Sequence, residues 1–473
     1  MTDRVNGPPA TPAGPLPADG LPAEELSAAP EHGGRGGRSI ATVALYTALS
    51  NFVLPLTSLA TAPILARELG ATGRGEMAAV IAPIFILVAL ASMGLPEAGA
   101  YAVAKLREEP RRVLRAAGWL TLVYGAVAVL LLVVVAPPYL RNAPQLVPLL
   151  RVVALLIPVS MWLLLVKAVV IGMRSHGVAA AERVLTPVLR LTAFVVLWVS
   201  GTLTVTSAVW AHLLCSVAGG SLLVVALLRR GPLPAAELTT APVERLTRHV
   251  AAYGLRGWGA VLGNLVIWRL DQVVLVALVS PRQLGYYVVA VSFAEISGMV
   301  VNSVRNMLFT EAAARDDRQL IARASRVMVL LVTGSAVAGI LVAEPLIWLL
   351  FGSDFEPSVR LAQVLMVASI PFCVDQMVTA GVYAEGHPGL RSISQITSAV
   401  VTVVLLVVLA PQIGAMGAAV ASLVAYCLGC AITVVAYHRI TGVPLRHLLV
   451  PGRADLALLG GLAGKVARKV RGR

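Results

Sequence analysis

The sequence predicts an all-α integral membrane protein with about twelve transmembrane helices in two six-helix bundles. The first observation is composition: of 473 residues, 58% are hydrophobic and only 13% are charged. Such a chain has too few polar residues to cover the surface of a soluble domain. The second is that apolar runs long enough to cross a bilayer as helices recur along the chain. The third is a weak internal repeat that relates the two halves.

The apolar runs divide the chain into bundles and connecting segments. They fall at about 40–65, 77–103, 113–136, 148–172, 186–203, 206–228, 252–279, 285–309, 327–350, 361–384, 392–410 and 414–437. Residues 1–38, rich in Pro, Gly and Ala, predict a disordered cytoplasmic tail. Residues 39–228 form the first bundle and 252–438 the second, with a cytoplasmic linker at 229–251. Residues 439–473 form a basic, amphipathic cytoplasmic tail, which either lies on the anionic inner leaflet or is solvated.

The basic residues define the orientation. One set of alternate loops, together with the two tails, holds 27 of the 38 Lys and Arg residues, and the opposite set holds six. Because positive charge stays on the cytoplasmic side, both termini are expected in the cytoplasm, in a multi-pass protein of the cell inner membrane. The net charge of +14 is therefore a topology signal, and no nucleic-acid partner is expected.

A shift of about 210 residues aligns the two halves. Gly75 falls on Gly285, and the stretch 171–177 falls on 380–386. Each half has six predicted spans, so both halves enter the membrane in the same direction. We therefore expect a parallel pseudo-two-fold axis along the membrane normal, with a substrate path between the halves near the midplane.

The stretch "VIWRLDQVVLV" at 266–276 places Arg269 and Asp271 inside an apolar run. A charge at the centre of a membrane helix costs about 3 kcal/mol on insertion scales, so each needs a partner or a wet cavity. Two positions apart, they point to opposite faces of the helix. Glu295 and Asp375 also lie near the midplane and are candidate partners for Arg269. A structural ion pair and a role in substrate or ion handling both remain open.

Other charged residues within spans are Lys167, Arg190, Arg256 and Arg305. The three arginines lie near the cytoplasmic ends of their spans, where they can reach the interface. No nucleophile, metal-ligand cluster or nucleotide-binding loop is recognisable, since "GATGRG" lacks the lysine and hydroxyl that follow a phosphate loop. We expect a transporter rather than an enzyme, with no cofactor and no metal.

Several stretches resemble the polysaccharide exporter family of the O-antigen-flippase type. They are "ILARELGATGRGEMAAVIAPIFILVALASMGLPEA", "VVIGMRSHGVAAAERVLTPVLRL", "RLDQVVLVALVSPRQLGYYVVAVSFAE", "LLFGSDFEPSVRLAQVL" and "LAPQIGAMGAAVASLVAYCLGC". The resemblance covers about residues 40–440 and extends to the multidrug and toxin extrusion proteins of the same superfamily. It implies a flippase that moves undecaprenyl-diphosphate-linked oligosaccharide to the outer leaflet, for cell-surface polysaccharide or lipopolysaccharide biosynthesis. Alternating access through a cationic cavity is the implied mechanism. Membrane lipids, a glycan polymerase and glycosyltransferases are the implied partners.

Depth and charge then select the candidate site residues. The expected substrate-binding residues are Arg269, Lys167, Arg256 and Arg305. The expected ion-coupling residues are Asp271, Glu295 and Asp375. An alternative is an ion-coupled drug antiporter, which needs an acidic, aromatic-lined cavity, whereas only 5% of the chain is aromatic. A membrane-embedded glycan polymerase or a scaffold is a third class, which the short outer loops disfavour.

Overall fold

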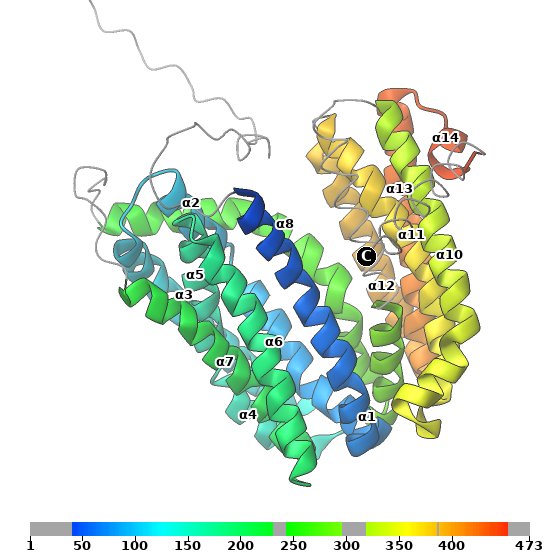
Figure 1. The fold of residues 1–473 in the computed structure, drawn as a ribbon, viewed down its shortest axis with the longest axis horizontal. Coiled ribbons are helices and arrows are strands. Elements are labelled where there is room, and N and C mark those ends of the chain that lie inside the picture. The colour runs from blue at the N-terminus through cyan, green and yellow to red at the C-terminus, as the bar shows by residue number, and fades with distance from the viewer. Residues whose placement is uncertain (1–39, 230–242, 296–317, 386, 453–473) are drawn as a thin grey trace, which may run out of the picture.

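A computed structural model describes residues 40–229, 243–295, 318–385 and 387–452, and over this part of the chain every regular element is a helix (Figure 1). The predicted tail 1–38, Arg305, most of the predicted linker and the last 21 residues of the basic tail lie outside the described residues. The all-helical fold class is confirmed for the part that the structure describes.

The first half runs from α1 to α7. Its elements are α1 (Ile40–Ala91), α2 (Leu95–Ala104), α3 (Pro110–Tyr139), η2 (Pro144–Leu146), α4 (Val147–Ala154), α5 (Ile157–Gly172), α6 (His176–Val199) and α7 (Val205–Arg229). The helix α1 contains the first predicted span, 40–65, and the first part of the second, 77–103, whose remainder falls on α2. It is broken at Gly70, where φ is 65° and ψ is −177°. A glycine adopts this conformation without a Cβ clash, so the chain reverses there without a loop.

The second half begins with α8 (Val243–Leu278), followed by a helical stretch over residues 281–295. The later elements are α10 (Arg318–Phe351), η4 (Ser353–Phe355), α11 (Pro357–Ala384), α12 (Pro388–Ile413), α13 (Ala415–Thr441) and α14 (Leu445–Leu449). The helix α8 starts inside the segment 229–251 that was predicted as a linker. Leu246 and Val250, one turn apart, are buried against residues of α2, α3 and α5, which explains why this amphipathic stretch is helical.

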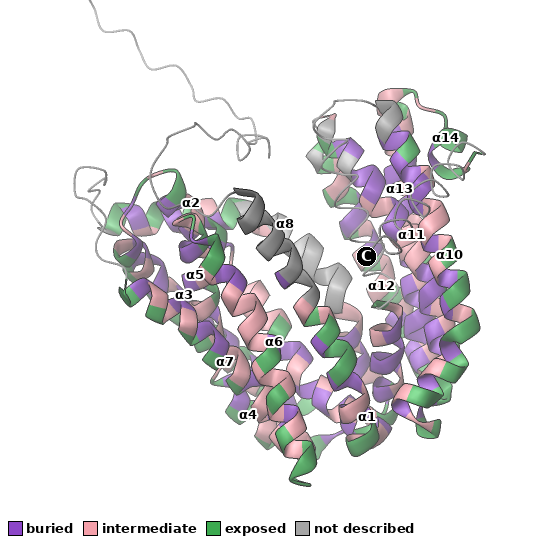
Figure 2. Cartoon of the chain, in the orientation of Figure 1, coloured by how far each residue is buried: buried purple, intermediate pink, exposed green. Residues whose placement is uncertain are grey.

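Seven described helices are long and apolar enough to cross a membrane, or eight if the bent pair 144–154 and 157–172 is one span. The count of twelve therefore stays a prediction. Large apolar side chains such as Trp119, Leu130 and Val134 of α3 are exposed, and exposed residues run along the outward faces of the helices (Figure 2). An apolar surface of this extent requires lipid as its solvent, so the chain is a multi-pass membrane protein.

The packing order of the first half recurs in the second. In the first half α1 packs on α6, α3 on α5, and both α5 and α6 on α7. In the second half α8 packs on α12, α10 on α11, and both α11 and α12 on α13. Figure 1 shows α1–α7 on one side and α10–α14 on the other, with α8 passing between them. The two groups meet at the end that carries Gly70, here the Gly70 end, and diverge toward the end that carries α2 and α14, here the α2 end.

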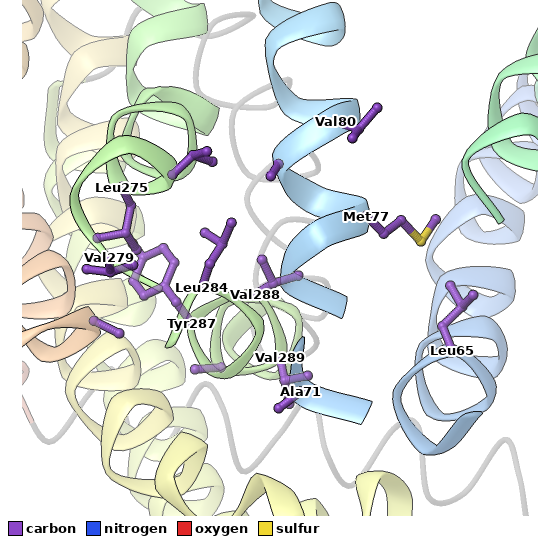
Figure 3. Packing of buried hydrophobic residues seen from close by; sticks show 14 of the residues in the cluster. Leu65, Ala71, Met77, Val80, Leu275, Val279, Leu284, Tyr287, Val288 and Val289 are labelled. Carbon is purple, nitrogen blue, oxygen red and sulfur yellow. The ribbon is translucent and has the colours of Figure 1, made fainter. Parts of the chain in front are cut away.

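The largest buried cluster joins the two halves at the Gly70 end. It brings Leu65, Ala71 and Val80 of α1 together with Leu275 of α8 and Leu284 of the 281–295 helix. Figure 3 shows Leu275, Leu284 and Tyr287 on one side of the second part of α1, and Met77 directed toward Leu65 on its other side. The halves are therefore held together by a shared apolar core at one end.

Candidate functional site

Two groups of polar side chains lie among these apolar helices, one in each half. The first-half cluster consists of Lys167, Glu182, Arg190, His212 and Ser216, on α5, α6 and α7. The second-half cluster is made of two separate groups: Asp271 with Tyr287, on α8 and the 281–295 helix, and Asp375 with Arg391, Ser394 and Thr433, on α11, α12 and α13. Buried polar groups need hydrogen-bond partners, so polar clusters among apolar helices are candidates for a functional site as well as for a structural one.

Arg190 is the centre of the first-half cluster. Its Nη2 atom donates a hydrogen bond to Ser216 Oγ on α7 over 3.0 Å, and Ser216 in turn donates to the backbone oxygen of His212. The Nε atom of Arg190 is buried and has no hydrogen-bond partner among the residues that the structure describes. Arg190 and Arg74 are both close enough to His212 to act on it electrostatically. The site is thus cationic and keeps one guanidinium donor open, whereas the sequence placed Arg190 at the membrane interface.

Lys167, a predicted substrate contact, forms an ion pair with Glu182. Its Nζ atom lies 2.6 Å from Glu182 Oε2, and the two side chains are 29% and 12% exposed. Thr186, one turn after Glu182, donates to Glu182 Oε1 over 3.3 Å. Glu182 was missed by sequence reasoning because the predicted span starts at 186, whereas α6 begins at His176 and carries Glu182 in its second turn. The pair neutralises both charges and holds α5 on α6.

Asp271 contacts a buried tyrosine of the next helix. The hydroxyl of Tyr287 donates to Asp271 Oδ2, and the backbone N–H of Gln272 donates to Asp271 Oδ1 over 2.8 Å. Tyr287 is fully buried, and Figure 3 shows its ring directed toward the helix that carries Leu275 and Val279. The hydroxyl satisfies the carboxylate without bringing a positive charge to it.

Asp375, in the half of α11 nearer the α2 end, has a similar arrangement. Thr433 on α13 donates to Asp375 Oδ1 over 2.6 Å, and Thr433 Oγ1 lies 3.1 Å from Ser394 Oγ. Ser394 is itself anchored, since it donates to the backbone oxygen of Gly429 over 3.0 Å. Arg391, one turn earlier on α12, acts electrostatically on Asp375 and stacks over the Tyr383 ring. The sequence predicted Asp375 as polar and buried but not its hydroxyl partners.

The remaining predicted residues are only partly placed. Arg269 lies on α8, but its side chain is outside the described residues. Arg256 is exposed, and Glu295 is exposed at the end of the described part of its helix. Asp375, a candidate partner for Arg269, contacts Thr433 on α13, and its relation to Arg269 stays a prediction. Over the described part of the chain, no group of three His, Cys, Asp or Glu residues is arranged to hold a metal ion.

This arrangement of helices is similar to that of several solved structures. Its fold is similar to the lipid II flippase MurJ in its inward closed conformation, with a TM-score of 0.68, 11% identity, and coverage of 89% of this chain and 93% of that one. It is also similar to an inward-facing multidrug resistance MATE family transporter of the MOP superfamily, with a TM-score of 0.67, 13% identity, and coverage of 84% and 98%. An outward-facing MATE structure matches with a TM-score of 0.57, 14% identity, and coverage of 85% and 95%. The chain has the fold of MOP-superfamily transporters.

The family follows from the sequence itself. The family described as "Polysaccharide biosynthesis protein" matches residues 41–309, which is more than half of the chain. The chain therefore belongs to the polysaccharide biosynthesis protein family, and the predicted resemblance is confirmed. No curated protein matches the sequence significantly.

Proposed function

We propose that the chain is a flippase that moves lipid-linked oligosaccharide, carried on undecaprenyl diphosphate, from the inner to the outer leaflet of the cytoplasmic membrane. The observation that carries the proposal is the buried, open Nε donor of Arg190 beside a second arginine and a histidine. The family and the flippase and transporter folds similar to this one support it. The α2 end then faces the cytoplasm, together with both termini.

A diphosphate is the ligand chemistry that suits Arg190. A guanidinium forms forked, charge-assisted hydrogen bonds with phosphate oxygens, and each such bond contributes about 1.5–3 kcal/mol. Lys167 is engaged by Glu182, so we assign it to holding α5 on α6. Arg269, Arg256 and Arg305 remain proposed contacts along the path, with Arg256 and Arg305 toward the cytoplasmic mouth.

Alternating access follows from two halves related by a parallel pseudo-two-fold axis. The recurrence of helix packing in the two halves supports this relation. So does the contact between Gly75 and Gly285, which align in the sequence repeat. The substrate would pass between the halves near the midplane. Glycosyltransferases and a glycan polymerase would supply and consume the lipid-linked oligosaccharide, and no cofactor is required.

We assign ion coupling to the second half, with Asp271, Asp375 and Glu295 as the proposed ion-binding carboxylates. Thr433 and Tyr287 supply hydroxyl oxygens next to Asp375 and Asp271, respectively. Carboxylate and hydroxyl groups bind a proton or a hard monovalent cation. A charge that moves with the halves also couples transport to membrane potential.

A drug antiporter is the second candidate function, and one observation favours it. The rings of Phe372 and Tyr426 lie 5.1 Å apart between α11 and α13, and Tyr426 is within electrostatic reach of Asp271 and Glu295. Acidic groups beside aromatic rings suit an organic cation. The cationic first-half cluster opposes such a ligand.

Deletion of the gene in its own cell distinguishes these functions. A flippase predicts loss of surface polysaccharide and accumulation of lipid-linked oligosaccharide in the inner leaflet, both restored by the intact chain. An antiporter predicts increased sensitivity to cationic drugs with unchanged polysaccharide. Unchanged lipid-linked oligosaccharide in the deletion strain would exclude the proposed flippase function.

A further inference from the structure

Helix ends from both halves meet at the Gly70 end and cap one another there. Five side chains take part, and we call them the Gly70-end clasp: Arg67 and Arg141 and Asn142 from the first half, and Arg282 and Asp354 from the second. Each lies within two residues of a member of the shared apolar core, such as Ala66, Leu140, Leu284 or Phe355. None of them belongs to the two polar clusters described above.

Asp354 joins the two halves directly. It lies in η4, between α10 and α11, and its Oδ2 accepts a hydrogen bond from the backbone N–H of Ala71 over 3.3 Å. Ala71 follows the break at Gly70, so this N–H begins the second helical part of α1. A carboxylate at this position caps the positive end of a helix. The other oxygen of Asp354 pairs with Arg282 Nη2 at 2.8 Å.

Residues of the first half cap helices of the second in return. Arg67 donates from Nε to Leu350 O over 3.1 Å and from Nη2 to Leu349 O, at the carboxyl end of α10. Arg141 donates from Nε to Ala277 O over 2.6 Å, and Asn142 donates to Val279 O over 3.0 Å, at the carboxyl end of α8. Cations at the negative ends of helices are stabilising. Each half therefore satisfies open backbone groups of the other.

The backbones also touch at one point within the clasp. A Cβ atom on Gly75 would overlap the carbonyl oxygen of Pro281, and one on Gly285 would overlap that of Ala71. The two contacts are reciprocal, because Gly75 aligns with Gly285 and Ala71 with Pro281 under the 210-residue shift. Only glycine permits this approach at both positions. The point where equivalent residues meet is where a two-fold axis would pass.

We propose that the clasp is a reversible latch that closes the Gly70 end, the outer end in the proposed orientation, and that must open for release to the outer leaflet. The inference rests on alternating access as the proposed function. Reversibility follows from the exposure of the caps, since Asp354 and Arg282 are 49% and 60% exposed and water can replace their bonds. The two glycines let the helices return to backbone contact. Asp354 is the member of the clasp from the second half that caps a first-half helix, and it also pairs with Arg282 of its own half, so we use it to test the latch.

Hydrogen exchange measured on the purified full-length chain in lipid nanodiscs tests the latch without any transport. Asp354→Ala should speed exchange about three- to tenfold in peptides covering residues 65–80 and 277–290. Peptides over 95–105, at the α2 end, should not change. The matched control is Glu356→Ala, since Glu356 is an exposed acid two residues away whose side chain forms no capping bond. Unchanged exchange in Asp354→Ala, or equal acceleration in both variants, would overturn the proposal.

A second variant tests the glycine contact. Gly285→Ala should speed exchange over the same peptides, whereas Gly334→Ala should not, because nothing lies within 4 Å of a Cβ at Gly334. If Gly285→Ala does not fold, Asp354→Ala alone decides. If these variants change exchange as predicted but the intact chain moves no lipid-linked oligosaccharide, the latch is supported and the proposed cargo is wrong. If the intact chain flips lipid-linked oligosaccharide but exchange is unaltered in Asp354→Ala, the proposed cargo is supported and the latch is wrong.

Discussion

The two halves of the molecule repeat the same helix packing but differ in how their buried charged groups are paired. In the first half the open group is the guanidinium of Arg190, and the acid Glu182 is neutralised by Lys167. In the second half the carboxylates Asp271 and Asp375 each receive an O–H donor. The repeated packing is what a rocking motion requires, whereas the sign of the embedded charge determines the ligand.

In the proposed function, this difference assigns anion binding to the first half and cation binding to the second. A hydroxyl donor stabilises a carboxylate while leaving it able to bind a proton or a cation. A guanidinium with an unused donor attracts an anion. Placed together, Arg190 and Asp375 would pair and cancel each other. Their location in separate halves keeps both available, which fits an anionic cargo driven by a cation.

The largest expected effect is at Arg190. Arg190→Ala should reduce flipping of lipid-linked oligosaccharide about tenfold or more, because one charge-assisted contact to a phosphate is worth about 1.5–3 kcal/mol. Arg190→Lys should recover part of this loss, since lysine keeps the charge but not the fork. Flipping is measured in proteoliposomes at equal protein level.

Arg151→Ala is the control for this change, because Arg151 is an exposed arginine on α4. It should flip at the normal rate. If Arg190→Ala flipped as fast as Arg151→Ala, the first half would not be the anion-binding half, and the comparison between the halves would fail.

A smaller effect is expected at Asp375. Asp375→Asn keeps the shape and the bond with Thr433 but removes the charge, so flipping driven by an ion gradient or voltage should fall about three- to tenfold. Exchange of substrate without a gradient should change little. Thr433→Ser, which keeps a hydroxyl at the same place, is the control. Loss of both driven flipping and exchange would assign Asp375 to substrate binding rather than coupling.

Much of the fold was predictable because a bilayer imposes strong rules. Apolar length and backbone satisfaction fix where helices form, so the predicted ranges 113–136 and 414–437 fall on α3 and α13. The break at Gly70 was not predicted as a kink, since the positive φ of one glycine leaves no mark on hydropathy. The early start of α8 was missed because its polar residues imitate a linker, although Leu246 and Val250 are buried on the other half.

The candidate site was less predictable, because partners come from tertiary contacts. The sequence located Asp271 and Asp375 by the cost of burying charge, but Tyr287 and Thr433 are ordinary residues until their helices are placed. Depth along a helix suggested that Arg190 reaches the interface. Its bond to Ser216 shows that rotation about the helix mattered more than depth. The sequence shows which charged residues lie deep within a span, but it does not show toward which neighbouring helix each side chain points.

The smallest effect on transport is expected where the first half neutralises its own charge. Lys167→Met should destabilise the chain by about 1–3 kcal/mol, because it leaves the largely buried Glu182 without its partner. The double variant Lys167→Met, Glu182→Leu should recover most of this stability, since apolar groups can replace a buried ion pair. Thermal unfolding in detergent measures the stability of these variants. Flipping by the double variant should stay close to normal.

The single and double variants together distinguish charged residues that hold the first half together from charged residues that contact the cargo. A double variant that folds well but flips as poorly as Arg190→Ala would return Lys167 to the substrate path, as the sequence predicted. The anion-binding region would then extend from α6 onto α5, toward the α2 end where Lys167 lies near the end of its helix. Normal flipping by that variant would confine the cargo contacts of the first half to Arg190 and its neighbours on α1 and α7.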